Sequence, residues 1–98
     1  MFAMRRANGD WFALEDDGRL RVPLFHSAHE ALMARLRTVE MLLFSPIELD
    51  AKLLNEIVGG RGEVDFCVIN DPFASLTRGL RLPQSQLSSL LASAAIPT

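Results

Sequence analysis

Two polar corners of the chain have residue types that could bind a small ligand. His26-Ser27 follows one strand-like run, and Asn70-Asp71 follows another. Because the carboxyl ends of parallel strands meet at one edge of a sheet, where open α/β sheets bind ligands, His26, Ser27, Asn70 and Asp71 would face one cleft if the strands are parallel. The favoured alternative is structural. In it, Asn70-Asp71-Pro72 forms an Asx-type turn whose side chains bond local amides.

Metal binding is the second chemistry to weigh, at His26, His29 and Glu30. Histidines three residues apart near the start of a helix can share a face, and a carboxylate could assist. A zinc site needs three or four protein ligands, and Glu30 is already required by the helix cap discussed below. We therefore expect no metal site and no cofactor.

Cys67 is the one cysteine, so no intramolecular disulfide can form, which fits a reducing compartment. It lies between Phe66 and Val68, and a thiol in apolar surroundings is unreactive. The glycine-rich run at 59–62 lacks the Lys-Ser/Thr that completes a phosphate-binding loop. With no convergent catalytic set, we expect no catalytic residues and favour a protein that is not an enzyme.

Arginines in the first part of the chain are the candidate nucleic-acid surface. The formal net charge is −2, which is too small to indicate a polyanionic partner. Carboxylates on the same predicted hairpin offset the arginines, so we expect a solvated, salt-paired face and no nucleic-acid binding. The arginines are Arg5, Arg6, Arg19 and Arg21, and the carboxylates are Glu15, Asp16 and Asp17.

The Asn70 corner must be positioned by a strand over Glu63–Asn70, which is rich in β-branched and aromatic residues. Its apolar run Phe66–Ile69 indicates a strand covered on both faces. Trp11–Glu15 and Arg19–Phe25 are two further predicted strands, and the Asp-Gly between them is typical of a hairpin.

The His26 corner leads into a predicted helix. Ser27 and Glu30 have the spacing of a capping box, and the helix should end near Arg37. Its apolar stripe, expected to face the core, consists of Ala28, Leu32, Met33 and Leu36.

The remaining elements follow from local signals. Val39–Phe44 is predicted to be a strand, with 46–49 an extended connection to a helix that Asp50 caps and glycines 59 and 60 end. Leu76–Leu82 is predicted to be the last strand, and a final helix opens at 83–85.

This order, ββαβαββα, predicts one α+β domain over residues 1–98. We expect a mixed sheet of about five strands with the helices mostly on one face. Residues 1–10 are expected to be a flexible arm that ends at the turn signal Asn8-Gly9-Asp10.

Leu20–Leu91 resembles the SseB-like N-terminal domain family of small bacterial α+β domains. The resemblance rests on Val22-Pro23-Leu24-Phe25-His26-Ser27 entering a helix, on Leu49-Asp50 starting another, and on Val68-Ile69-Asn70-Asp71-Pro72. The family often has Thr where His26 stands, and Asp71 is inserted into its Asn-Pro turn. The resemblance implies an accessory or protein-interaction module in bacteria and transfers no catalytic residue.

We therefore predict a non-enzymatic interaction module that binds a protein partner or a second copy of itself through Trp11, Phe12 and Phe73. The alternative is a small ligand-binding domain or enzyme that uses the Asn70–Phe73 corner and the His26-Ser27 helix entry. No apolar run approaches the ~20 residues that span a membrane, and no leader pattern is seen, so we expect a cytoplasmic protein without a membrane partner.

Overall fold

The computed structural model describes residues 1–16, 18–59, 64–71 and 79–95. They form one α+β domain with a mixed sheet, as predicted, although the sheet has six strands. The elements in chain order are β1 (Phe2–Arg6), β2 (Leu14–Asp16), β3 (Arg19–Phe25), α1 (Ala28–Arg37), the 3₁₀ helix η1 (Val39–Met41), β4 (Phe44–Glu48), α2 (Ala51–Gly59), β5 (Val64–Ile69), β6 (Leu80–Leu82) and α3 (Gln84–Ala95).

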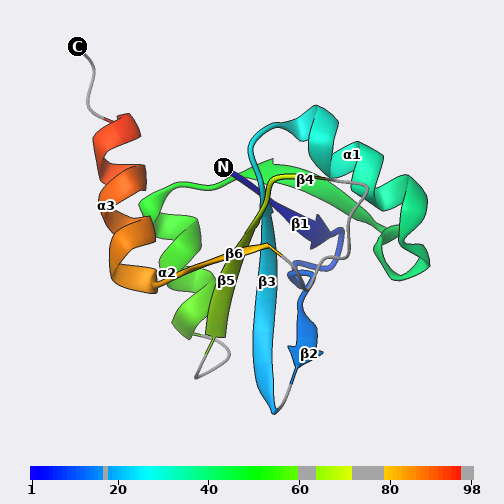
Figure 1. The fold of residues 1–98 in the computed structure, drawn as a ribbon, viewed down its shortest axis with the longest axis horizontal. Coiled ribbons are helices and arrows are strands. Elements are labelled where there is room, and N and C mark those ends of the chain that lie inside the picture. Colours follow the sequence, from blue (N-terminus) through cyan, green and yellow to red (C-terminus); the bar gives the residue numbers. More distant parts are fainter. Residues whose placement is uncertain (17, 60–63, 72–78, 96–98) are drawn as a thin grey trace.

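The sheet is built around the parallel pair of β3 and β5, which Figure 1 shows at its centre. The strand order is β4-β1-β3-β5-β6, and β2 also pairs with β3. Every other pair of named strands is antiparallel. The register of β3 and β5 runs from Leu20↔Val64 to Phe25↔Ile69, so both strands end at the same level of the sheet.

The side chains of β5 alternate between two hydrophobic clusters, one on each face of the sheet. Phe66 and Val68 pack with residues of α2 and α3, whereas Cys67 and Ile69 pack with residues of α1. None of these four side chains is more than 4% exposed. The prediction of a strand covered on both faces is therefore confirmed.

The crossovers explain why α1 lies on the opposite face from α2. The connection from β3 to β4 runs one way along the sheet, and the connection from β4 to β5 runs back. Right-handed connections then place their helices on opposite faces. Two of the three helices, α2 and α3, lie on one face of the sheet, as predicted, and α1 lies on the other.

α1 begins as predicted, but it presents a different face to the core. The Ser27 hydroxyl accepts a hydrogen bond from the Glu30 amide at 3.2 Å, which is the expected N-cap. The buried residues of the helix are Ala31 and Ala34. The predicted core stripe is wrong, because Leu32 is 37% exposed and Leu36 77%. Small alanines let the helix approach the sheet closely, and the leucines then point outward.

The predicted strand over Val39–Phe44 is also wrong. Residues 39–41 form η1, and the strand β4 follows at Phe44–Glu48, where we expected a connection. β4 is an edge strand, and an edge tolerates Pro46 where its nitrogen faces away from the ladder. The Asp50 cap is confirmed, since its Oδ1 accepts from the Leu53 amide at 2.8 Å.

The expected flexible arm is in fact strand β1. Residues 2–6 pair along their whole length with β4, and Phe2 also pairs with Phe25 of β3. Ala3 and Met4 are fully buried, one in each of the two clusters. Burial on both faces and ladder bonds on both edges hold this segment in the sheet.

The predicted hairpin forms between β2 and β3, where Asp16 pairs with Arg19. Gly18 has a φ of 78°, in the left-handed region that favours glycine. The first strand is shorter than predicted, because Trp11 makes only an isolated bridge to Arg5. β6 covers Leu80–Leu82. Of the rest of the predicted last strand, Gly79 forms a bend, and residues 76–78 lie outside the described residues.

Gly79 allows the chain to pass close to β5. A Cβ atom there would lie 2.5 Å from the Val68 carbonyl oxygen and 2.6 Å from Cys67 Sγ. We expect Gly79→Ala to lower the free energy of unfolding by about 1–3 kcal/mol in urea denaturation. Gly59→Ala is the control, because its Cβ would meet no atom within 4 Å. Equal stability of the two variants would contradict this close packing.

Candidate functional site

The parallel β3–β5 pair brings the two predicted polar corners together. His26 follows β3, Asn70 follows β5, and His26 Nε2 lies 2.9 Å from Asn70 Oδ1. This is a hydrogen bond when the Nε2 tautomer carries the proton. Ser27 and Asp71 adjoin these residues in the chain, so all four predicted binding residues lie at one edge of the sheet.

The polar groups of this corner bond one another, and the corner is open to solvent. His26 and Asn70 are both exposed, and each uses a polar atom on the other. The Ser27 hydroxyl is occupied by the helix cap. Phe73, the far end of the predicted corner, lies outside the described residues. Within the described ranges, no three His, Cys, Asp or Glu side chains are grouped so that they could hold a metal ion.

Cys67 is a buried thiol, as predicted, with 2% of its surface exposed. Burial raises the pKa of the Cys67 thiol above its ordinary value of 9.0. The nearby Arg21 charge and a hydrogen bond with the Gly79 backbone offset only part of this effect. A thiol with a raised pKa has little thiolate at neutral pH and is a poor nucleophile.

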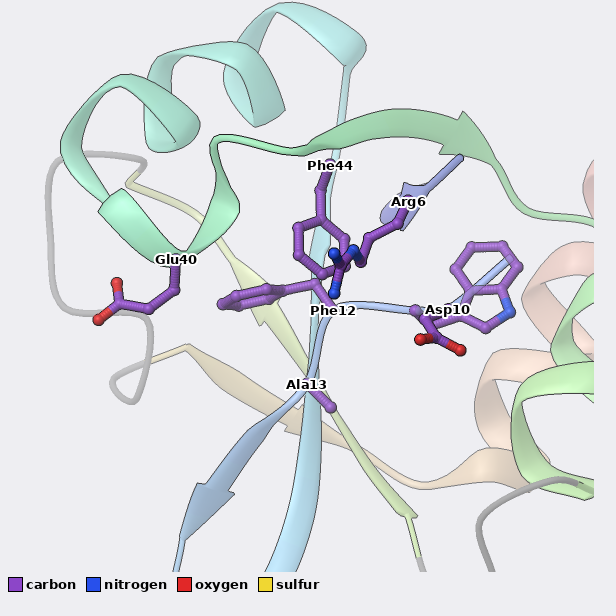
Figure 2. A pocket seen from close by; sticks show the side chains of 7 residues that line it. Arg6, Asp10, Phe12, Ala13, Glu40 and Phe44 are labelled. Carbon is purple, nitrogen blue, oxygen red and sulfur yellow. The ribbon is translucent and has the colours of Figure 1, made fainter. Parts of the chain in front are cut away.

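A shallow pocket of about 380 Å³ lies on the α1 side of β1, and two of the predicted interaction residues, Trp11 and Phe12, are among the residues that line it. Figure 2 shows the rings of Phe12 and Phe44 side by side, with the carboxylates of Glu40 and Asp10 at either end. The two rings meet edge to face, with centroids 5.2 Å apart. The lining residues are Arg6, Asp10, Trp11, Phe12, Ala13, Glu40 and Phe44.

Arg6 lies over one of the aromatic rings of this pocket. Its guanidinium carbon lies 5.5 Å from the centroid of the Phe44 ring, a cation–π contact. Arg35 fixes the same segment from α1, since Nη1 donates to the Phe44 carbonyl at 3.0 Å. One guanidinium and two carboxylates leave the pocket weakly acidic. The turn signal at Asn8-Gly9-Asp10 was the clue to it, because this turn folds Phe12 back beside β1.

Two of the three predicted interaction residues, Trp11 and Phe12, are core residues. Trp11 and Phe12 are each 5% exposed and belong to the clusters on opposite faces, so they are core residues. Successive side chains of an extended segment point to opposite faces, so these two neighbours lie on different sides of the sheet. Phe73 lies outside the described residues. Trp11 and Phe12 therefore do not form the exposed apolar contact surface that we expected of them.

Large apolar side chains are exposed elsewhere, around the end of α1. They lie in one short stretch of chain that runs from the outer face of the helix through η1 to the start of β4. We call them the α1–η1 surface; its members are Leu32, Leu36, Val39, Leu42 and Leu43, exposed by 37, 77, 77, 57 and 73%. Glu40 and Phe44, which line the pocket, lie in or next to this stretch.

One arginine of the hairpin, Arg19, is salt-paired with a carboxylate on the neighbouring strand β5, and Arg81 of β6 shares that carboxylate. Arg19 Nη2 lies 3.0 Å from Asp65 Oδ1 on β5, and Arg81 Nη2 lies 3.5 Å from Asp65 Oδ2. Asp65 therefore connects β5 with β3 and with β6. Its side chain is only 13% exposed. Pairing across strands offsets the positive charge of this face.

The hydrogen bond at the polar corner can be measured by a double-mutant cycle. His26→Ala and Asn70→Ala should show a coupling of roughly 0.5–1 kcal/mol in their free energies of unfolding. The control pairs His29→Ala with Asn70→Ala, and their effects should add, because no His29–Asn70 bond is formed. A coupling near zero for His26 and Asn70 would show that the corner is not closed in solution.

The Cys67 thiol should react with a disulfide reagent only as fast as the chain opens. Labelling at pH 7 should therefore be slow in the native protein and accelerate with urea. Above pH 9.0 the unfolded chain loses its thiol proton while the folded chain keeps it, so the free energy of unfolding should fall. Cys67→Ala should lack this fall, and immediate labelling of native protein would contradict burial.

Within the part of the chain that the structure describes, no helix has the length and apolar character needed to cross a membrane. The resemblance to SseB-like N-terminal domains stays a prediction. No model of a known protein family, no curated protein and no solved structure matches this chain.

Proposed function

We propose that this chain is a non-enzymatic protein-interaction module that binds through the α1–η1 surface. The observation that supports this most directly is the exposure of Leu36, Val39 and Leu43, each more than 70% accessible to solvent. Monomeric proteins rarely expose contiguous apolar patches larger than a few hundred Å², and the largest apolar patch of a small protein is often a functional surface.

The exposure is notable because α1 and the run Met41–Phe44 both have sequences typical of a core. The α1 stripe has the helical spacing that normally faces a core, and the run Met41–Phe44 is continuously apolar. In the fold, α1 instead buries Ala31 and Ala34, and Leu42 and Leu43 lie in the turn before β4. A partner that covers these exposed side chains would remove their apolar surface from water, and this would stabilise the complex.

The alternative, a ligand-binding domain or enzyme at the polar corner, has weaker support. His26 and Asn70 satisfy each other, Ser27 caps α1, and the corner is exposed. The pocket beside β1 is open and shallow, with Arg6 already stacked on Phe44. An accessory role in bacteria depends on the family resemblance alone.

Site-specific photo-crosslinking in the native cell tests the proposed surface. A photoreactive side chain at Leu36 should form discrete protein adducts, and one at Leu90 on α3 should not. Leu90 is the matched control because it is also an exposed helical leucine, at 48%. Adducts at both positions alike, or at neither, would contradict a specific interaction surface on α1.

Polar substitution provides the complementary prediction. Leu36→Ser with Val39→Ser should change the free energy of unfolding by less than about 1 kcal/mol, because both side chains are already in water. The same variant should lose the adducts that form from a photoreactive group at Leu43. Leu90→Ser should keep them, and a double variant that unfolds would show that these residues belong to the core.

A further inference from the structure

We infer that the pocket beside β1 receives a basic side chain of the partner that covers the α1–η1 surface, in the place where Arg6 now lies over the Phe44 ring. This inference rests on the proposed function, because it names the chemistry of the same partner. The pocket is open and shallow, so it suits one side chain of a docked protein better than a free ligand, which a binding pocket normally encloses.

The pocket and the α1–η1 surface share one short segment of the chain. Glu40 lines the pocket and follows Val39, and Phe44 lines it and follows Leu43. Val39 and Leu43 are both exposed. Because the Cα atoms of neighbouring residues are about 3.8 Å apart, a partner that covers these aliphatic side chains is within reach of the pocket.

The walls of the pocket favour a positive charge. Figure 2 shows the Phe12 and Phe44 rings between two carboxylates, those of Asp10 and Glu40. Aromatic rings attract cations at their faces, and the carboxylates add to that attraction. The Asp10 carboxylate accepts a hydrogen bond from the Asn8 amide at 3.1 Å, whereas the Glu40 carboxylate bonds no other residue that the structure describes. Glu40 is therefore the group that an incoming cation would pair with.

Arg6 shows that the pocket accepts a guanidinium, and this guanidinium is loosely held. It lies 5.5 Å from the centroid of the Phe44 ring, and it has no hydrogen bond or ion pair with any described residue. Arg5 differs, because it stacks on Trp11 at 4.9 Å and is also fixed by Glu56 at 2.7 Å. A cation–π contact alone is weak at an exposed site, so an arginine or lysine of the partner can take the place of Arg6.

The aliphatic side chains beside the pocket would strengthen such a contact. Arginine is enriched among the residues that contribute most to protein interfaces, where it is seated in a pocket and surrounded by contacts that exclude water. Exclusion of water strengthens an ion pair because the local dielectric constant falls. The partner is therefore a protein segment with aliphatic side chains and at least one arginine or lysine.

Titration of the isotope-labelled full chain with N-acetyl-arginine methylamide tests the pocket by itself, by nuclear magnetic resonance. The backbone amide signals of Phe12, Glu40 and Phe44 should shift with a dissociation constant of about 1–10 mM. The citrulline analogue, which lacks the charge, should bind about fivefold more weakly. Equal binding of the two probes, or unchanged signals at these amides, would overturn the inference.

Two substitutions should change the affinity for the arginine probe in opposite directions. Glu40→Gln should weaken binding about threefold, because it removes the available carboxylate. Arg6→Gln should tighten binding about threefold, because it removes the competing cation. Glu48→Gln is the matched control at the far end of β4, and it should leave the affinity unchanged. An affinity that Arg6→Gln leaves unchanged or lowers would overturn the displacement of Arg6.

Crosslinking separates this inference from the proposed function. Glu40→Gln should reduce the protein adducts that form from a photoreactive group at Leu36. Adducts that this variant leaves unchanged would overturn the basic contact while the interaction surface stands. Probe binding that depends on Glu40, without any specific adduct at Leu36, would overturn the proposed surface and its partner and leave a pocket for a free cation. Failure of both measurements would overturn both proposals.

Discussion

The parallel pairing of β3 and β5, buried on both faces, is the constraint on which the rest of the structure depends. A parallel pair cannot be joined by a tight turn, so the chain must leave the sheet after β3 and return before β5. It does so through α1, β4 and α2, and the reversal of direction places α1 and α2 on opposite faces. The same pairing brings His26 and Asn70 to one edge, where they bond each other.

The strands β1 and β4 extend the sheet on the β3 side of this pair, and β1 adds buried side chains to both hydrophobic clusters. β1 lies between β3 and β4 and contributes one fully buried side chain to each cluster, Ala3 on one face and Met4 on the other. The sheet ends at β4, which contains Pro46 and whose Phe44 carbonyl accepts a hydrogen bond from Arg35. Proline and an occupied carbonyl both discourage addition of a further strand at this edge.

The close approach of α1 to the sheet connects the fold with the proposed function. Alanines at 31 and 34 fill the contact, so the larger leucines of the helix remain outside. The chain then makes one turn of 3₁₀ helix before β4, which exposes three more aliphatic residues beside the same helix end. The exposed aliphatic side chains at this end of the helix therefore result from packing on its opposite side.

The sequence alone determined the elements whose signals are local. The β-branched run of β5, the Asp-Gly turn before β3, and the caps at Ser27 and Asp50 are all where their residue types predict, because neighbouring residues decide these features. Only the tertiary structure decided which side of α1 faces the core, that residues 2–6 join the sheet, and that Val39, Leu42 and Leu43 face outward while Met41 is buried. Periodicity shows that a segment has an apolar side, but the space available beside the sheet decides whether leucine or alanine fills it.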